Sequence, residues 1–412
     1  MTDASMTAQP IAARERYEIM DVLRGFALFG VLIANMAELG GQDILATADQ
    51  LAALPTASLD AATSWMLNLF VFDKANTLFT VLFGIGFWIQ LERLSERGAA
   101  FGTIYLRRIT ILTLIGFVHL LGWFGWDILH LYGLMAFILY FSRNLSDRAL
   151  FWIGLPLLLF GRPLISWALG QFGFVTDLQD QAYSEVAVLA RQSAARSGDF
   201  IAWVGLMNDM NWLDWFLGGT ILGWVAYGLG RFYLGAWIAR QGWIQNADDH
   251  IQVIKIWTFP ILLVGLGLQF GVQSFEDAPG ASWAEGSPFL LDVLTGIATP
   301  IIAIGYVCVL MIMFHGSATK VLVRPFAPVG QMALTNYLIQ SPIIILILTG
   351  AGPGLALAGK AGSATFALLS IGVFAVQVIV SHFWMKAFAY GPAEWVWRGL
   401  TYRTWPRLRR AS

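Results

Sequence analysis

Two of the five histidines in this 412-residue chain lie in one short stretch, RRITILTLIGFVHLLGWFGWDILHLYG, residues 107–133. His119 precedes a turn rich in Gly and Trp, whereas Asp127 and His130 follow the turn, three residues apart and therefore on one face of a helix. If the flanking segments are antiparallel helices, the turn brings His119 against Asp127. Because a neutral histidine oriented by a carboxylate is a competent general base, the spacing predicts proton-transfer chemistry at these three residues. The alternative is a buried polar cluster that only stabilises the hairpin.

Further polar and charged residues interrupt the apolar segments elsewhere in the chain. A charge in the core of a bilayer is costly, so it requires either a partner or a function. Asp21 and Arg24, for example, stand three residues apart and form either a structural ion pair or part of a polar cavity. We predict a polar cavity between the helices, lined by Asp21, Arg24, Asn35, Asp73, Asn76, Arg162, Asn336 and Glu394.

The composition places this chemistry in a membrane. The chain is 57% hydrophobic and only 12% charged, about half the charge of a soluble domain. Several apolar runs reach the roughly 20 residues that cross the hydrocarbon core as a helix. The sequence therefore predicts an all-α polytopic integral membrane protein, a bundle of about ten transmembrane helices. The expected spans are 19–39, 65–92, 104–123, 127–142, 148–169, 213–238, 252–272, 289–314, 325–349 and 363–387.

Lys and Arg are concentrated in alternate predicted loops and near both ends of the chain. The positive-inside rule therefore predicts that both termini face the cytoplasm, which agrees with an even number of spans. We divide the chain into a disordered N-terminal tail (1–18), an N-terminal transmembrane bundle that is the candidate catalytic half (19–170), an extracytoplasmic loop (171–212) and a C-terminal transmembrane half (213–412).

Two features of this organisation leave alternatives open. From Tyr183 to Arg196 the loop has apolar and charged residues at helical spacing, which predicts an amphipathic helix that lies either at the membrane surface or against the bundle. The glycines from Gly218 to Gly235 indicate close helix packing, either within one chain or in a homodimer.

Several function classes lack sequence support. The chain has no Walker loop, no dinucleotide-binding fingerprint and no HExxH or GxSxG motif. Its single cysteine, Cys308, lies in an apolar run, and no Cys/His spacing suits a metal. We therefore predict neither a bound metal nor a nucleic-acid partner.

Five stretches together resemble the YeiB-like family of bacterial membrane proteins, whose C-terminal half is the domain of unknown function 418. One is the hairpin at 107–133, and the others are DVLRGFALFGVLIANM (21–36), TLFTVLFGIGF (77–87), GQMALTNYLIQS (330–341) and GPAEWVWRGLTY (391–402). Together they extend over nearly the whole chain, and the last two are the most specific. Gln331 stands where the family usually has Arg, which removes support for any role of that side chain.

The N-terminal half of that family is similar to the transmembrane acyltransferase superfamily. Its members transfer an acyl group from a cytoplasmic CoA thioester to an acceptor across the membrane, using a membrane-embedded histidine. The sugar O-acyltransferases of the superfamily have a His near the outer end of the first span, where this chain has Asn35. His119 is therefore the expected substitute.

The resemblance implies a multi-pass protein of the bacterial cytoplasmic (inner) membrane. Acyl-CoA is the expected co-substrate, and a small molecule or an envelope glycan is the expected acceptor. Membrane lipids are a further expected partner. His119 would act as the general base on the acceptor. The phosphates of CoA would be bound by Arg93, Arg97, Arg107, Arg108 and Arg398, although positive-inside topology alone also explains these residues.

Two other functions fit the same residues. A transporter or exporter of a small polar or amphipathic solute would use the intramembrane ionisable residues to line a path. A non-enzymatic scaffold would need His119 and Asp127 only for stability.

Overall fold

A computed structural model describes residues 18–96, 101–243, 246–276 and 288–410, and all elements in these ranges are helices. The predicted tail 1–18 therefore lies almost wholly outside the described residues, as does Arg97. The helices are α1 (Glu18–Leu39), α2 (Ala48–Ala52), α3 (Ala57–Phe70), α4 (Lys74–Glu96), α5 (Phe101–Gly122), α6 (Leu129–Phe141), α7 (Asp147–Leu169), α8 (Gly173–Tyr183), α9 (Glu185–Ser197), α10 (Phe200–Met210), the π-helix η2 (Asn211–Leu217), α11 (Thr220–Arg240), α12 (Ala247–Glu276), α14 (Pro288–His315), α15 (Lys320–Val323), α16 (Phe326–Gln331), α17 (Ala333–Leu348), α18 (Ser363–Ala387) and α19 (Pro392–Tyr402).

Seven helices of the described chain are long and apolar enough to cross a membrane, with α3 and α4 counted together. The segment Lys320–Gln331, which contains α15 and α16, would add an eighth span if it acts as one with α17, but the two are bent by 84° at their junction. Helix α6, at 13 residues, is shorter than a full span. A multi-pass helical membrane protein is thus confirmed, whereas the count of about ten spans and the cytoplasmic position of both termini remain predictions.

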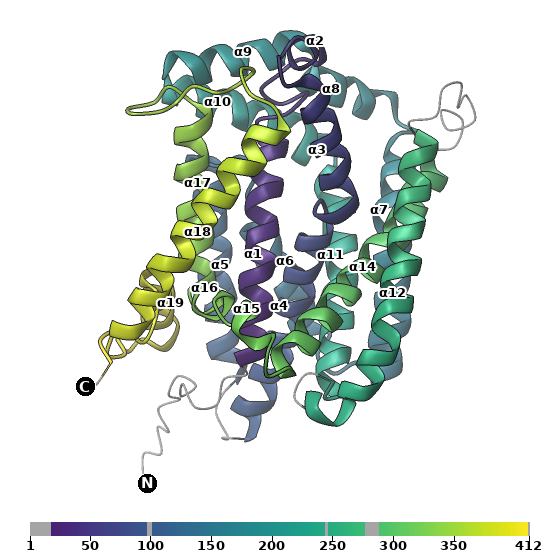
Figure 1. Cartoon of the computed structure of the whole chain (residues 1–412), viewed down its shortest axis with the longest axis vertical. Coiled ribbons are helices and arrows are strands. Elements are labelled where there is room, and N and C mark those ends of the chain that lie inside the picture. The colour runs from purple at the N-terminus through teal and green to yellow at the C-terminus, as the bar shows by residue number, and fades with distance from the viewer. Residues whose placement is uncertain (1–17, 97–100, 244–245, 277–287, 411–412) are drawn as a thin grey trace.

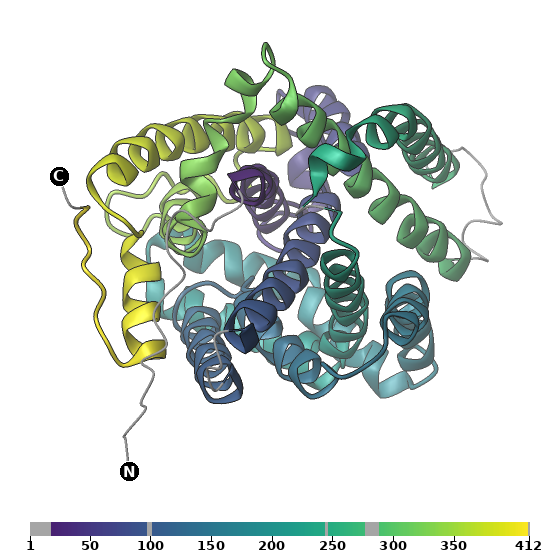
Figure 2. The same cartoon turned by 90° about the horizontal axis from the view of Figure 1, so that it is seen from below.

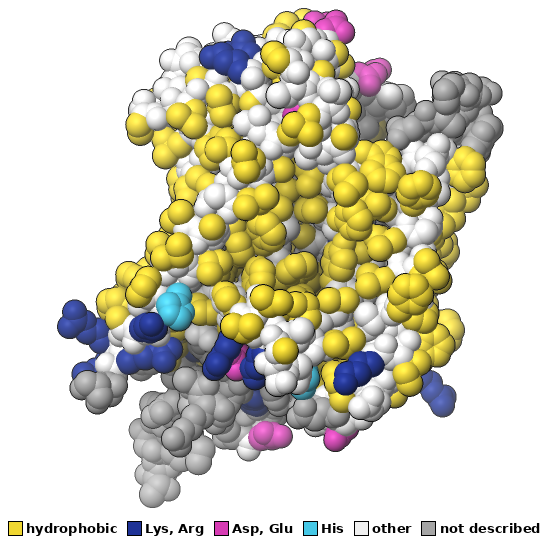
Figure 3. All heavy atoms as spheres, in the orientation of Figure 1, with side chains coloured by type: hydrophobic (Ala, Val, Ile, Leu, Met, Phe, Trp, Pro, Cys, Tyr) yellow, Lys and Arg dark blue, Asp and Glu magenta, His cyan; other side chains and the backbone are white. Residues whose placement is uncertain are grey.

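The helices form one bundle with a surface typical of a membrane protein. Helices α1 and α4 lie near its centre, with α18 and α19 on one side and α12 and α14 on the other (Figures 1 and 2). A broad apolar band covers the middle of the face seen in Figure 3, and Lys and Arg gather mainly at the end where α19 lies. Such a band suits contact of this face with the hydrocarbon core of a membrane.

The two predicted transmembrane halves interlock. Helix α1 packs against α16, α17 and α18 of the C-terminal half, and α11 packs against α4 and α7 of the N-terminal half. The functional surfaces described below are therefore built from both halves.

The segment predicted as an extracytoplasmic loop forms helices α8, α9, α10 and η2 at the end of the bundle remote from α19 (Figure 1). Arg191 on α9 is 2% exposed, and its guanidinium donates to the carbonyl oxygens of Ile44, Ala182 and Asp43 at 3.0, 2.8 and 2.9 Å. These bonds hold α9 against α8 and the turn at Asp43 and Ile44, while its position relative to the membrane surface stays a prediction.

Small residues bring the helices around the hairpin of α5 and α6 close together. A side chain at Gly116 of α5 would meet the backbone of His130, and one at Gly133 of α6 would meet Thr113. Glycine at these points lets the two helices approach at backbone distance. This close approach sets His119 and His130 on facing helices.

Glycines of the Gly218–Gly235 stretch likewise pack α11 within the chain, which accounts for them without a homodimer. A side chain at Gly235 would meet the backbone of α4 at Val81 and Gly84. We expect Gly235→Ala to destabilise the protein by about 1–3 kcal/mol, because two helix backbones must separate.

The control is Gly267→Ala on α12, where an added Cβ meets nothing within 4 Å. This change should leave the melting temperature unchanged or slightly raised, because Ala favours a helix over Gly. Thermal unfolding of the detergent-purified variants measures both. Equal melting temperatures for the two variants would contradict the packing argument.

Candidate functional site

The predicted contact between His119 and Asp127 is present, and it is part of a larger buried cluster. His119 Nδ1 lies 2.7 Å from Asp127 Oδ1, and His130 Nδ1 lies 2.9 Å from Asp127 Oδ2. The backbone N–H of His130 also donates to Oδ2, at 3.0 Å. All three side chains are fully buried. One carboxylate therefore serves two imidazoles from opposite sides.

The outer partner of His130 fixes the hydrogen position on its ring. Trp215 Nε1 lies 3.2 Å from His130 Nε2, and an indole N–H can only donate. His130 Nε2 therefore accepts, so Nδ1 carries the proton and donates to Asp127. His119 Nε2 lies 2.7 Å from Ser341 Oγ, a hydroxyl that can donate or accept, so this contact leaves the tautomer of His119 unassigned. His130 is thus assigned as a neutral imidazole that donates to Asp127.

Ser341, His119 and Asp127 have the hydrogen-bond order of a Ser–His–Asp triad. The order alone does not make Ser341 a nucleophile, because the side chains of Ser341 and His119 are buried and line neither of the two cavities described below. Asp127 is the member of the cluster that lines a cavity, although its side chain is as buried as those of the two histidines. Exchange of protons with a bound molecule through Asp127 therefore requires a movement that exposes its carboxylate.

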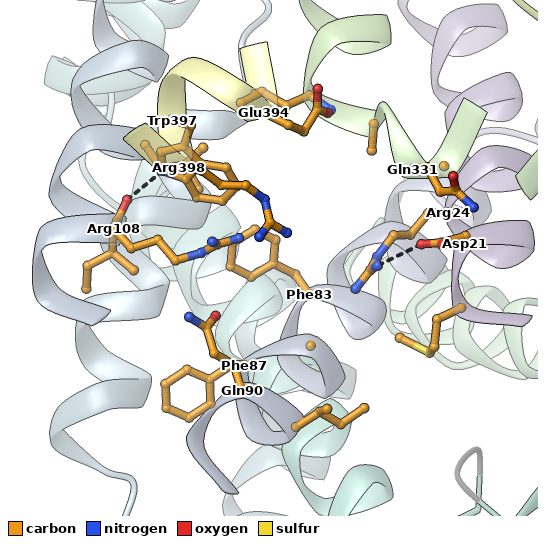
Figure 4. Close-up of a pocket in the computed structure, with 18 of the residues that line it drawn as sticks. Asp21, Arg24, Phe83, Phe87, Gln90, Arg108, Gln331, Glu394, Trp397 and Arg398 are labelled. Carbon is orange, nitrogen blue, oxygen red and sulfur yellow. Dashed lines mark hydrogen bonds and ion pairs between the residues drawn. The ribbon is translucent and has the colours of Figure 1, made fainter. Parts of the chain in front are cut away.

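A cavity of about 270 Å³ opens between α1, α4, α5, α17 and α19, and we call it the arginine cavity. Its charged lining residues are Arg24, Arg93, Arg108, Arg398, Asp21 and Glu394. The guanidinium groups of Arg24, Arg108 and Arg398 extend into it from three different helices (Figure 4). Arginine clusters of this kind suit phosphate groups, which they bind with paired N–H donors.

Two contacts fix the arginine side chains in the wall of this cavity. The guanidinium carbon of Arg108 lies 3.7 Å from the ring centre of Trp397, whose Nε1 donates to the Arg108 carbonyl at 3.0 Å. Arg24 Nη1 donates to Asp21 Oδ1 at 3.3 Å, the ion pair that the sequence predicted. The wall therefore has ordered positive charge.

Glu394 has a structural role at the edge of the arginine cavity. Its Oε1 accepts from the backbone N–H groups of Leu334 and Thr335 at 2.7 and 3.2 Å, and its Oε2 accepts from Thr335 Oγ1 at 2.5 Å. It thus caps the first turn of α17 where the chain bends away from α16. Burial raises the pKa of Glu394 above 4.5, although these hydrogen bonds act in the opposite direction.

A second cavity, of about 340 Å³, lies further along α1, and we call it the acidic cavity. Its charged lining residues are Glu38, Asp73, Asp127, Asp214 and Arg162, and the predicted residues Asn35 and Asn76 also line it. Arg162 Nη1 lies 3.4 Å from Asp73 Oδ2. Helix α8 and the π-helix η2 complete the wall with Tyr183 and Asp214.

The two cavities meet at one wall. Phe79, Leu129 and Tyr337 line both of them. The Tyr337 hydroxyl donates to Asp127 Oδ1 at 3.3 Å and accepts from the backbone N–H of Ile128 at 3.2 Å. The Asp127 cluster is therefore bonded directly to the barrier between the cavities.

Two residues predicted for these sites lie elsewhere. Arg107 is absent from the lining of both cavities, because it turns to α19 and donates to the carbonyl of Thr401 at 2.8 Å. Asn336 also lines neither cavity, because its amide donates to the Val329 carbonyl and to Ser381 Oγ at 3.1 and 3.0 Å. Arg107 and Asn336 therefore have no place in the cavity walls predicted for them.

Sequence reasoning missed several residues of the site, namely Ser341, Tyr337, Glu38, Trp215 and Trp397. Ser341 and Tyr337 belong to the GQMALTNYLIQS stretch, and Trp397 belongs to GPAEWVWRGLTY. The sequence feature that could have indicated these three residues is the specific family resemblance of the two stretches. Nothing in the sequence paired Ser341 with a histidine 222 positions away.

The helices, the spans and the two cavities define a multi-pass α-helical membrane protein with an internal polar site. The chain belongs to the YeiB-like family: it is 30% identical to the uncharacterized protein YxaH of Bacillus subtilis over 98% of both chains. It is 29% identical to the uncharacterized protein YeiB of Escherichia coli, over 94% of this chain and 97% of that one.

Two further comparisons agree with this assignment. A family model described as "Protein of unknown function (DUF418)" matches residues 238–404. An uncharacterized 39.9 kDa protein from the amylase 3′ region of Bacillus acidopullulyticus is 26% identical over 97% of this chain and 98% of that one. No solved structure matches the chain.

The Glu394 cap gives a prediction about stability and pH. Glu394→Ala leaves the first N–H groups of α17 without their acceptor, so we expect a loss of about 1–3 kcal/mol. Glu394→Gln resembles the protonated acid and keeps an acceptor, so its loss should be smaller.

The pH dependence follows from the raised pKa of Glu394. A carboxyl whose pKa is higher in the folded protein contributes stability that is complete below pH 4.5 and is lost as the pH rises through the raised pKa. Glu394→Gln removes this dependence. We therefore expect the stability of the wild type, relative to that of Glu394→Gln, to increase as the pH falls from about 8 to about 4 in thermal unfolding. A constant difference between the two would contradict the prediction.

Proposed function

We propose that this protein is a transmembrane acyltransferase that moves an acyl group from acyl-CoA in the arginine cavity to an acceptor in the acidic cavity. The observation that carries the proposal is that two cavities of opposite charge meet at one thin wall, beside a carboxylate held by two histidines. One cavity suits a phosphorylated donor and the other a different molecule. A reaction between two partners needs such a pair of sites.

The orientation in the membrane follows from the distribution of charge. Lys and Arg gather at the end of the bundle where α19 lies, and the arginine cavity lies toward that end of α1 (Figures 1 and 3). By the positive-inside rule, this end faces the cytoplasm. The protein then resides in the bacterial cytoplasmic membrane, with the acidic cavity on the external side.

The arginine cavity suits the phosphates of acyl-CoA by charge, and its volume of about 270 Å³ holds only part of that molecule. These phosphates would be bound by Arg93, Arg108 and Arg398, whose guanidinium groups offer paired donors. The slender acyl-pantetheine arm would lie against the aromatic side of the cavity, along Phe83 and Phe87, and end at the wall of Phe79 and Tyr337. The thioester carbonyl would then lie within reach of the acidic cavity.

Transfer requires one bond to form and one to break. The oxygen or nitrogen of the acceptor attacks the thioester carbonyl, the carbon–sulfur bond breaks, and the proton of the acceptor passes to the leaving thiolate to give free CoA. Asp127 accepts this proton once a movement of the wall exposes its carboxylate, and it returns the proton to the thiolate, while His119 holds Asp127 in place through Nδ1. The general-base role predicted for His119 thereby passes to Asp127, because both ring nitrogens of His119 are already hydrogen-bonded.

Acetyl-CoA binding tests the donor site. We expect saturable micromolar binding to the detergent-purified protein, with free CoA as a competitor. Arg108→Gln should weaken binding about 10-fold or more, because it removes a charged donor from the arginine cavity. Arg107→Gln is the matched control, since the neighbouring Arg107 bonds to Thr401 outside the cavity. Absence of binding at millimolar acetyl-CoA in a folded sample would overturn the proposal.

Turnover tests the proton-carrying group. With thioester consumption as the readout, Asp127→Asn should lower the rate about 100-fold or more, while acetyl-CoA binding is retained. Ser341→Ala should keep most of the rate, since Ser341 lines neither cavity. Gel filtration and melting temperature establish that both variants fold. A rate unaffected by Asp127→Asn would remove Asp127 from the mechanism.

Transport of one solute is the alternative that shares most of these residues. A solute that crosses the protein would have to bind first among arginines and then among carboxylates. The opposite charges of the two cavities therefore disfavour transport of one charged solute through both. Movement of a solute into sealed vesicles without loss of a thioester would favour transport instead.

A further inference from the structure

We propose that the acidic cavity binds a small organic cation, a hydroxylated primary amine. This inference deepens the proposed function, because it gives the chemical class of the acceptor, but the binding itself does not depend on acyl transfer. It rests on the charge, the aromatic surface and an unpaired amide of the cavity.

Acidic side chains predominate in the lining of the cavity, and most of them have no cation beside them. Carboxylates outnumber cations four to one in its lining, and only Asp73 has the cation, Arg162, as a partner. Asp214 accepts from the hydroxyls of Tyr183 and Thr220 at 2.7 and 2.6 Å, and these neutral donors leave its charge in place. A largely enclosed site with this excess of negative charge favours a cationic ligand.

Glu38 adds a carboxylate that has room for a ligand. One of its oxygens, Oε2, accepts from Trp126 Nε1 at 3.2 Å, a single neutral donor. Asn35, which lies one turn before Glu38 on α1, lines the same cavity. Glu38 is only partly buried, so an ammonium group bound in the cavity can reach it.

Aromatic rings line the same space, with Trp126, Trp215, Trp224, Tyr132 and Tyr183 among them. The faces of such rings attract cations, and Trp does so most strongly. Trp224 already has the guanidinium of Arg162 at 4.6 Å from its ring centre. The cavity thus combines the two kinds of group that recognise ammonium ions.

A second, independent observation indicates a polar ligand. Asn211 lines the acidic cavity and is 6% exposed, and its amide nitrogen Nδ2 has no hydrogen-bond partner. A buried amide N–H without an acceptor is unfavourable by about 1–3 kcal/mol. A ligand hydroxyl would supply the acceptor. The cavity volume of about 340 Å³ is at the lower end for small-molecule sites, which suits a compact molecule.

A pair of probes that differ in one group tests the inference. 1-Amino-1-deoxysorbitol carries an ammonium group where sorbitol carries a hydroxyl. We expect the detergent-purified full chain to bind the amine saturably, at least 10-fold more tightly than sorbitol, in equilibrium binding at fixed ionic strength. Equal affinities, or no binding of either, would overturn the inference.

Variants locate the binding. Glu38→Gln should weaken amine binding at least 10-fold. Glu92→Gln is the matched control, because the exposed Glu92 also accepts from a tryptophan, Trp88 Nε1 at 2.8 Å, but lies outside the acidic cavity. Equal loss in both variants, or loss in neither, would overturn the assignment to this cavity.

The design separates this inference from the proposed function. If the amine binds in a Glu38-dependent way but the protein consumes no thioester, the cation site is supported and the proposal of acyl transfer is rejected. Thioester consumption that accepts sorbitol as readily as the amine would uphold acyl transfer and remove the cation site.

Discussion

The structure depends on the need to keep one ionised carboxylate in an apolar interior. Asp127 is stabilised there by four donors from three helices: the imidazoles of His119 and His130, the backbone N–H of His130, and the hydroxyl of Tyr337. Removing any one donor leaves a buried charge less well solvated, which is costly in a low dielectric. The hairpin of α5 and α6, helix α17 and the π-helix that carries Trp215 are therefore held in register by a single negative charge.

Helix α17 connects this charge to the arginine cavity. Its first turn is capped by Glu394 in the wall of that cavity, its second turn carries Tyr337 in the barrier, and its third carries Ser341 behind His119. The bend of 84° between α16 and α17 frees the backbone groups that Glu394 binds. The helical hydrogen bonds at the bend are therefore lost. The backbone N–H groups that they leave free bind Glu394 and so attach α19 to α17.

Local contacts could be predicted from the sequence, and distant ones could not. His119 and Asp127 are eight residues apart across a short turn, so antiparallel helices bring them together whatever surrounds them. Ser341 requires knowledge of how α17 packs on α5. Arg107 and Arg108 differ by one position, or about 100° around a helix, and only the place of α19 decides which of them enters the cavity. The number of spans was equally hard to predict, because α6 is short and α16 and α17 are bent.

The opposite charges of the two cavities bear on what the barrier between them does. Phe79 and Leu129 offer no charge and no hydrogen bond, so an ion that leaves one cavity loses its partners before it gains those of the other. An acyl group has no charge to lose and is small and largely apolar. A wall of this composition therefore disfavours passage of either charged partner into the other cavity. A path for a charged solute would need the reverse, whereas the proposed transfer needs only the acyl group to cross.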